Sequence, residues 1–211
     1  MSSFNSCLHF KNPYAVSLST IFFVNLFFLL SSSYYNMPEI KESKVIYSGR
    51  VVRLRIDYLK DKEIRVREVV EHPGAVAILP VISRGRILLI NQYRYPVGKW
   101  ILEVPAGTIK AGESTDECAL RELEEETGYK AGILKKMLTI YPSPGYSTES
   151  IHIYVASELE KSTQKLEEDE ELTIIEMDID EAIEELKKRD EVDGKTLLAL
   201  LYYKYLYQGY E

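Results

Sequence analysis

Four glutamates crowd one short stretch of the chain, and their spacing suggests a metal site. Glu122, Glu124, Glu125 and Glu126 fall within five residues of the segment Gly107–Tyr129, which reads GTIKAGESTDECALRELEEETGY. On a helix, residues three and four apart share a face, and each like-charged pair costs about 0.2–0.5 kcal/mol. A divalent cation such as Mg²⁺ or Mn²⁺, bound through oxygen, offsets such repulsion. The alternative is a glutamate-rich helix face in contact with solvent.

The predicted ends of this helix argue against a glutamate-rich face that only contacts solvent. Ser114 and Glu117 have the spacing of a capping box, which predicts the helix start, and Gly128 is a natural left-handed stop. Glu125 and Glu126 then fall in the last turn, where the helix dipole disfavours negative charge. Broken local rules of this kind tend to mark functional sites.

The complete spacing resembles the Nudix box. The pattern is a glycine, five residues, a glutamate, seven residues, and then Arg-Glu-apolar-x-Glu-Glu-x-Gly-apolar. The matching positions are Gly107, Glu113, Arg121, Glu122, Leu123, Glu125, Glu126 and Gly128. Tyr129 departs from the aliphatic residue that is usual at the end of the box, although a tyrosine can also fill an apolar position.

Three further segments resemble the ADP-ribose pyrophosphatase branch of this family. They are REVVEHPGAV, QYRYPVGKWILEVPAG and SPGYSTE, at 67–76, 92–107 and 143–149. In that branch a proline lies about sixteen residues beyond the box, as Pro144 does here. The resemblance covers most of 44–203 and implies an enzyme that acts on a nucleoside diphosphate sugar. It also implies a homodimer in which N-terminal strands are exchanged between subunits.

The resemblance implies a ligand set for the metal, which we expect to be Mg²⁺, with Mn²⁺ as a substitute. Glu122 and Glu126 are the principal expected ligands, joined by Glu125 and the backbone carbonyl of Ala106. Arg121 lies four residues before Glu125, so we expect it to orient that carboxylate rather than to contact substrate.

The expected base comes from a different segment, because the carboxylates of the helix serve as ligands. In the branch a glutamate in the loop after Ser-Pro-Gly acts on the attacking water, and Glu149 matches it. Glu125 is the next candidate for the base. The alternative for Glu149 is a surface glutamate, and we expect its loop to be a mobile lid.

Substrate recognition is expected from arginines, since a guanidinium group can make paired hydrogen bonds to phosphate oxygens. Arg67 and Arg94 lie in the segments that match the branch, and Glu68 and Glu103 are candidates to shape the nucleoside pocket. The alternative is that these are ordinary surface residues of strands.

The activity that the resemblance implies is Mg²⁺-dependent hydrolysis of ADP-ribose to AMP and ribose 5-phosphate. Two alternatives stay open: a pyrophosphatase for another nucleotide sugar or a dinucleotide, and a module that binds nucleotides without cleaving them. A module without catalysis has no reason to carry the repulsion of Glu122, Glu125 and Glu126.

Length and composition fit one domain with a proper core, or one domain plus an appendage. The chain has 211 residues, 45% of them hydrophobic, and a net charge of −7, and no basic stripe marks it as a nucleic-acid binder. Its two cysteines, Cys7 and Cys118, form neither a disulfide framework nor a zinc spacing.

Hydrophobic patterning predicts an α+β protein with a mixed sheet between helices, the α/β/α sandwich that the Nudix resemblance also implies. Strands are expected at 52–58, 64–71, 75–82, 87–93, 101–104, 137–141, 151–156 and 174–179, with helices after Ser114, after Asp178 and over Thr196–Tyr207. An acidic connection is expected at 157–171. The organisation is a small β-strand subdomain at 37–73 and a Nudix domain at 74–211.

Residues 1–36 differ sharply from the rest, since Lys11 is their only charged side chain and Ala15–Leu30 is almost entirely apolar. They are read as a mis-assigned start before Met37, a signal peptide or a marginal membrane anchor. We expect a cytoplasmic protein, or a membrane-anchored one if this extension is retained.

Overall fold

The computed structural model describes residues 38–60, 65–166, 168 and 170–207. The apolar extension expected at 1–36 and most of the turn expected at Lys60–Glu63 lie outside the described residues. Within the described part of the chain, no helix has the length and apolar character needed to cross a membrane.

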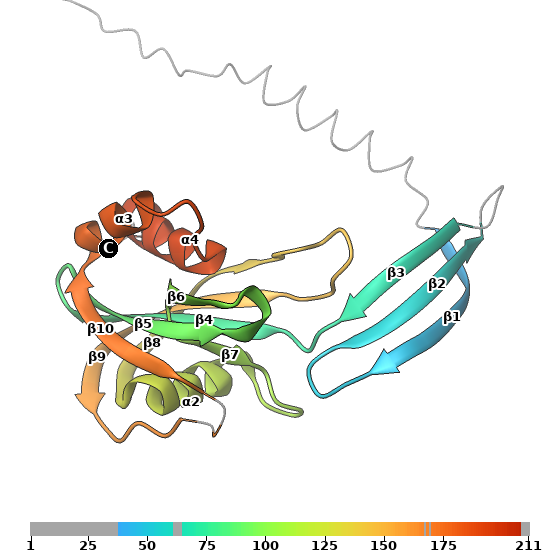
Figure 1. The fold of residues 1–211 in the computed structure, drawn as a ribbon. Coiled ribbons are helices and arrows are strands. Elements are labelled where there is room, and N and C mark those ends of the chain that lie inside the picture. Colours follow the sequence, from blue (N-terminus) through green and yellow to red (C-terminus); the bar gives the residue numbers. More distant parts are fainter. Residues whose placement is uncertain (1–37, 61–64, 167, 169, 208–211) are drawn as a thin grey trace, which may run out of the picture.

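A mixed sheet forms the centre of the molecule (Figure 1). Its strand order is β10-β5-β4-β9-β8, with β6 added to β5 and β7 added to β4. Only β4 and β9 pair in parallel, and the other pairs are antiparallel. The strands are β4 (Ala75–Ser83), β5 (Arg86–Arg94), β6 (Lys99–Glu103), β7 (Ala106–Thr108), β8 (Tyr129–Ile140), β9 (Ile151–Lys161) and β10 (Leu172–Asp178).

Strand β4 explains why both faces of this sheet are covered. Its alternate residues Val76 and Ile78 pack with Cys118, Ala119 and Leu123 of helix α2 (Thr115–Thr127). The intervening Ala77 and Leu79 join a larger core cluster that includes residues of α3 (Ile179–Lys187) and α4 (Gly194–Tyr202). Helices therefore lie on opposite faces of the sheet, and the predicted sandwich is confirmed.

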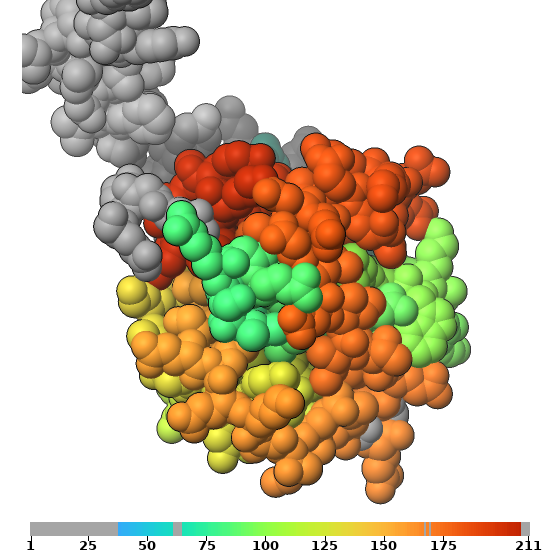
Figure 2. All heavy atoms as spheres, turned by 90° about the vertical axis from the view of Figure 1, so that its left-hand side faces the viewer, coloured from blue at the N-terminus to red at the C-terminus, as the bar shows by residue number. Residues whose placement is uncertain are grey.

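The C-terminal part of the chain closes one edge of the sheet. Strand β10 is the last strand at one end of the sheet order. Figure 2, turned by 90° from Figure 1, shows a face formed largely by orange and red residues of the C-terminal half around a green patch. Helix α3 begins at the predicted capping box of Asp178 and Glu181. The last predicted helix is shorter than expected, since α4 ends at Tyr202 and gives way to one π-helical turn, Tyr203–Tyr207.

A second, three-stranded antiparallel sheet stands apart from this body (Figure 1). It consists of β1 (Glu39–Ser48), β2 (Arg53–Lys60) and β3 (Arg65–Glu71). Strand β1 is absent from the prediction, because its Lys and Glu residues obscure the alternation. Its apolar residues Ile40, Val45, Ile46 and Tyr47 are each at least 50% exposed, so this sheet carries an uncovered apolar surface.

Two strands are longer than their apolar patterns predicted. Strand β8 begins at Tyr129 rather than Met137, because lysines and a glycine interrupt its alternation at the edge of the sheet. Strand β9 continues to Lys161, so the expected connection at 157–171 is wrong over its first five residues, 157–161. A short strand that was not predicted, β7, contains Ala106 and pairs with β4.

Candidate active site

Helix α2 turns two of its glutamates inward. Its N-cap Ser114 and Glu117 form the predicted capping box, and Gly128 ends it at φ 69°. Glu122 and Glu126 lie on the same buried stripe as Leu123, with exposed fractions of 8% and 1%. Carboxylates that serve only to solvate a helix lie on its solvent-exposed face, opposite the core. These two glutamates therefore lie against the sheet and need a compensating partner there.

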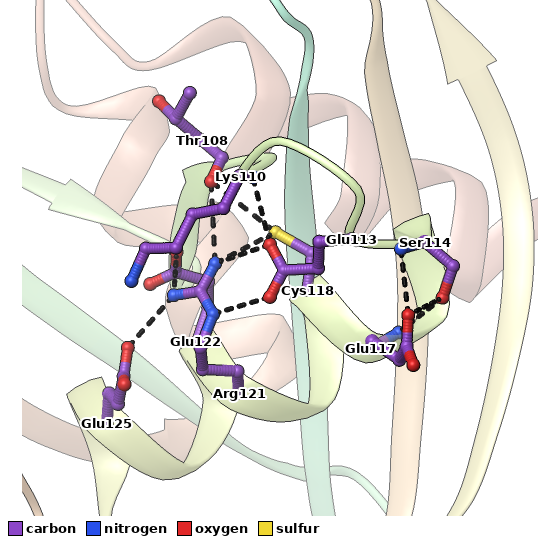
Figure 3. A network of polar contacts seen from close by, with 9 residues as sticks. All are labelled: Thr108, Lys110, Glu113, Ser114, Glu117, Cys118, Arg121, Glu122 and Glu125. Atoms are coloured by element: carbon purple, nitrogen blue, oxygen red, sulfur yellow. Dashed lines mark hydrogen bonds and ion pairs between the residues drawn. The ribbon is translucent and has the colours of Figure 1, made fainter. Parts of the chain in front are cut away.

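Arg121 holds the neighbouring carboxylates in place (Figure 3). Its guanidinium group donates to Glu122 Oε1 at 2.6 Å and to Glu125 Oε2 at 2.9 Å. It also binds Glu113 in a paired arrangement, at 2.6 and 2.9 Å. These hydrogen bonds hold the pKa of Glu113 at about 2. The orienting contact expected from the spacing of Arg121 and Glu125 is present, and Glu113 serves as the anchor of the arginine.

Glu126 is the least compensated charge of the site. Its Oε2 accepts the backbone N–H of Ala106 at 2.9 Å, while Oε1 is one of two buried side-chain atoms without a hydrogen-bond partner in the described residues. Burial raises the pKa of Glu126 well above its usual value, opposed by the Ala106 bond and reinforced by Glu122 and Glu170. A buried carboxylate oxygen without a partner can accept a cation.

Gly107 makes room for the second inward carboxylate. A Cβ atom at this position would lie 2.0 Å from the carboxyl carbon of Glu122, which is far inside contact distance. Burial raises the pKa of Glu122, although the hydrogen bond from Arg121 opposes the shift. The glycine of β7 is therefore required by the approach of a side chain rather than by its own backbone angles.

These residues fit a divalent cation by their chemistry. The donors are carboxylate and backbone oxygens, the ligands that Mg²⁺ and Mn²⁺ prefer, and one of them is buried without a partner. In the described part of the chain, no three acidic, histidine or cysteine side chains are already gathered in a ligating arrangement. Arg121 occupies one oxygen each of Glu122 and Glu125 in this structure.

A cavity of about 580 Å³ borders Ala106, whose N–H binds Glu126, and Gly107, which the Glu122 carboxylate approaches. Its lining includes Ala106 and Gly107 of β7, together with the charged side chains of Arg94, Glu149 and Lys195. Of the site residues expected from the sequence, the structure thus brings Arg94, Ala106 and Glu149 to one cavity next to the glutamates of α2.

Glu103 binds the two positively charged side chains that line this cavity, Arg94 and Lys195. It is 1% exposed, and its Oε1 and Oε2 accept from Arg94 at 2.8 and 2.9 Å, while Lys195 also binds Oε2. Burial by itself would raise the pKa of Glu103, but Arg94 and Lys195 outweigh it and lower the pKa. Because its oxygens are already engaged, Glu103 supports Arg94 here and does not face the cavity as the expected nucleoside contact.

The loop that carries Glu149 is attached to the N-terminal sheet. Val70 of β3 donates its N–H to the Tyr146 carbonyl at 2.8 Å and accepts from the Thr148 N–H at 2.9 Å. Glu149 Oε1 lies 3.9 Å from His72 Nδ1, which accepts the Gly74 N–H at 3.1 Å. The expected mobile lid is therefore hydrogen-bonded as a short parallel partner of β3 in this structure.

Arg67 and Glu68 are not brought to the cavity within one chain. Both are exposed residues of β3, in the sheet that stands apart from the body, and Arg67 donates to the carbonyl of Val66 at 2.9 Å. In this structure they therefore do not line the cavity that contains Arg94 and Glu149.

Two charged residues near the site were missed in the sequence. Lys195 lies in the first turn of α4, where a positive charge opposes the helix dipole, and that irregularity was a usable signal. Glu170 is close enough to raise the pKa of both Glu122 and Glu126. It belongs to an acidic run whose pattern does not distinguish it from its neighbours.

Comparisons with known proteins show which proteins this chain resembles. The family model described as NUDIX domain matches residues 71–201. The chain is 41% identical to the ADP-ribose pyrophosphatase of Bacillus subtilis (strain 168) over 164 residues, which are 74% of this chain and 87% of the relative. It is equally identical to the methanol dehydrogenase activator of Bacillus methanolicus over 165 residues, 76% of this chain and 89% of that protein.

More distant relatives extend the same picture. The GDP-mannose pyrophosphatase of Escherichia coli O1:K1 / APEC is 30% identical over 186 residues, 82% of this chain and 90% of the relative. A crystal structure of an ADP compounds hydrolase matches with a TM-score of 0.72 at 25% identity, covering 82% of this chain and 96% of the other. Because the family model spans more than half of the chain and these relatives are covered almost whole, the chain belongs to the Nudix family.

Proposed function

We propose that this protein hydrolyses ADP-ribose in a reaction that requires a divalent cation, giving AMP and ribose 5-phosphate. The observation that carries the proposal is the pair of inward glutamates on α2, beside a cavity whose lining includes Arg94 and Lys195. One water is added across the pyrophosphate, one P–O bond breaks, and the proton of the attacking water must be accepted nearby.

Glu122, Glu126, Glu125 and the backbone of Ala106 are the residues that would hold Mg²⁺, with Mn²⁺ as a substitute. The unpartnered Glu126 oxygen and the space that Gly107 leaves for Glu122 support this assignment. When bound, the cation supplies positive charge that neutralises the phosphate oxygens and acidifies the attacking water.

Arg94 and Lys195 are proposed to bind the pyrophosphate oxygens from the opposite wall. Both side chains are fixed by the buried carboxylate of Glu103, so little conformational entropy is lost when phosphate binds. Asp193 holds Lys195 from the other side at 3.0 Å. We therefore assign Glu103 to positioning of the two cations.

Two carboxylates compete for the role of the base. Glu149 lines the cavity, as the sequence resemblance implies, and its exposed fraction of 29% leaves it accessible to water. Glu170 contributes to the raised pKa of both Glu122 and Glu126, which makes it a second candidate. We keep Glu149 as the proposed base and treat Glu170 as its direct competitor.

The substrate is tested with a panel. The purified protein is incubated with Mg²⁺ and ADP-ribose, GDP-mannose, a dinucleotide or ATP, and products are identified by ³¹P NMR. We expect ADP-ribose to give AMP and ribose 5-phosphate with the highest kcat/KM. GDP-mannose is the second candidate because the relative from Escherichia coli is named GDP-mannose pyrophosphatase. Binding of ADP-ribose without turnover of any compound would instead support a nucleotide-binding module.

The base is tested by comparing Glu149→Gln with Glu170→Gln in the same assay. The variant that lacks the base should lose about 10²–10⁴-fold in kcat with little change in KM, because the base acts on water in the transition state. If Glu149→Gln raises KM at unchanged kcat while Glu170→Gln loses kcat, the role passes to Glu170.

A homodimer is the second proposal, supported by the uncovered apolar residues of β1 and the position of Arg67 on the same sheet. Mixing Arg67→Ala with Glu126→Gln tests it. If Arg67 serves the partner's site, half of the dimers regain one intact site, which restores about a quarter of wild-type activity. If Arg67 serves its own chain, mixing restores nothing.

We also propose a cytoplasmic location. Fractionation of the native cells is the test, and recovery of the protein in membranes with residues before Met37 attached would contradict it.

A further inference from the structure

The segment Ser162–Lys165, which follows β9, runs across the C-terminal end of α2. We call these four residues the strap. The strap lies in the part of the chain expected to be an acidic connection, yet it makes four hydrogen bonds to the last turn of α2 and the residue that follows it. It therefore contacts the turn that carries Glu125 and Glu126.

Two strap residues donate hydrogen bonds to the backbone carbonyls of expected metal ligands. The side-chain amide of Gln164 donates to the Glu126 carbonyl at 2.6 Å, and the Lys165 N–H donates to the Glu125 carbonyl at 2.9 Å. The last carbonyls of a helix have no partner within the helix itself. The strap supplies partners for the two that belong to Glu125 and Glu126.

The remaining strap contacts fix its path. The Ser162 N–H donates to the Gly128 carbonyl at 2.6 Å, and the Ser162 hydroxyl donates to Glu124 Oε1 at 2.6 Å. A Cβ atom on Gly128 would lie 3.0 Å from the Gln164 backbone nitrogen. Gly128 is thus needed twice, for its φ of 69° and for the close passage of the strap.

We propose that Gln164 is a positioning residue for the metal ligands of α2. The inference rests on the proposed function, because it assumes that Glu125 and Glu126 hold the cation. Helix ends fray, and two carboxylates in a last turn favour fraying because they lie at the negative end of the dipole. A ligand that is in place for only a fraction of the time binds metal more weakly by that fraction. Gln164 keeps the turn formed before the metal arrives.

The test measures metal binding directly, without turnover. Mn²⁺ binding to the full chain is titrated by electron paramagnetic resonance for the wild type and for Gln164→Met, which keeps the size of the side chain and removes its donor. We expect Kd for Mn²⁺ to rise about tenfold, the usual effect of losing a group that supports a metal ligand.

Ser162→Ala is the matched control. It also removes one hydrogen bond between the strap and α2, but that bond goes to Glu124, which lies outside the expected ligand set. Its Kd should stay within about twofold of wild type. Thermal unfolding in the presence of EDTA verifies that both variants fold. A stabilising role alone would lower both melting temperatures and leave both Kd values unchanged, which would overturn the inference.

Glu126→Gln separates this inference from the proposed function. If wild type and Glu126→Gln bind Mn²⁺ equally, the metal assignment itself fails. If Glu126→Gln loses binding while Gln164→Met binds like wild type, the metal assignment stands and only the role of Gln164 is refuted.

Discussion

The Glu126→Gln variant should be more stable than the wild type without metal and less stable than the wild type with Mg²⁺. Without metal, the wild type buries a carboxylate whose Oε1 has no hydrogen-bond partner. Glutamine has the same shape and can still accept the N–H of Ala106. A neutral amide costs less to bury without a partner than a charged oxygen does. The metal-free variant should therefore be more stable than the metal-free wild type.

The magnitude follows from the position of the residue. Removing a negative charge from a helix C-terminus gains about 0.3–1 kcal/mol, and removing the i,i+4 repulsion with Glu122 gains about 0.2–0.5 kcal/mol. About 1 kcal/mol raises Tm by about 2–4 °C in a chain of this size. With Mg²⁺ at 100 times Kd, the wild type gains about 2.7 kcal/mol that the variant does not. The order of the two melting temperatures then reverses, and the variant should be inactive.

Differential scanning calorimetry at pH 8, in EDTA and then in Mg²⁺, measures both orders. Glu124→Gln is the matched control on the same helix, because Glu124 is bound by Lys130 at 3.3 Å and lies outside the ligand set. It should leave the response to Mg²⁺ unchanged. Equal gains from Mg²⁺ in wild type and Glu126→Gln would refute the reasoning, as would near wild-type turnover of the variant.

Three further predictions use the same site. Gly107→Ala should abolish Mn²⁺ binding measured by electron paramagnetic resonance, because its Cβ would occupy the place of the Glu122 carboxylate. The metal-free stability advantage of Glu126→Gln should be absent below about pH 4.5, where the wild-type carboxyl is protonated in both states. It should grow from there up to the raised pKa of Glu126, because the unfolded chain releases a proton that the folded chain keeps, and level off above that pKa; urea unfolding from pH 4 to 8 measures it. Lys195→Met should raise KM for ADP-ribose about 10-fold or more with a smaller change in kcat, because one charge-assisted bond to phosphate is lost; steady-state kinetics would contradict this if only kcat fell.

Helix α2 could be predicted from the sequence because its signals are local. Ser114, Glu117 and Gly128 fix its two ends within a few residues, and the structure has both ends where the pattern places them. The contact between Arg121 and Glu125 follows from one helical turn. Strand β4 could be predicted equally well, because its continuous apolar run directly indicates a strand that is covered on both faces.

The features that escaped prediction depend on partners far away in the chain. Glu103 became an anchor because Lys195 lies 92 residues later and the fold brings them together. The strap shows the same limit, because the Gln164 side chain finds the Glu126 carbonyl only after β8 and β9 have formed a hairpin. No local pattern carries this information.

The pairing of Val70 with the loop at 146–148 limits how this protein can be divided. In the sequence, His72-Pro73-Gly74 is a natural place to cut between the small sheet and the Nudix body. In the fold, such a cut would leave the Tyr146 carbonyl and the Thr148 N–H without their partners and would remove the backbone on which the Glu149 loop rests. A shortened chain that begins at Gly74 would therefore retain helix α2 but lose the hydrogen bonds that hold the Glu149 loop.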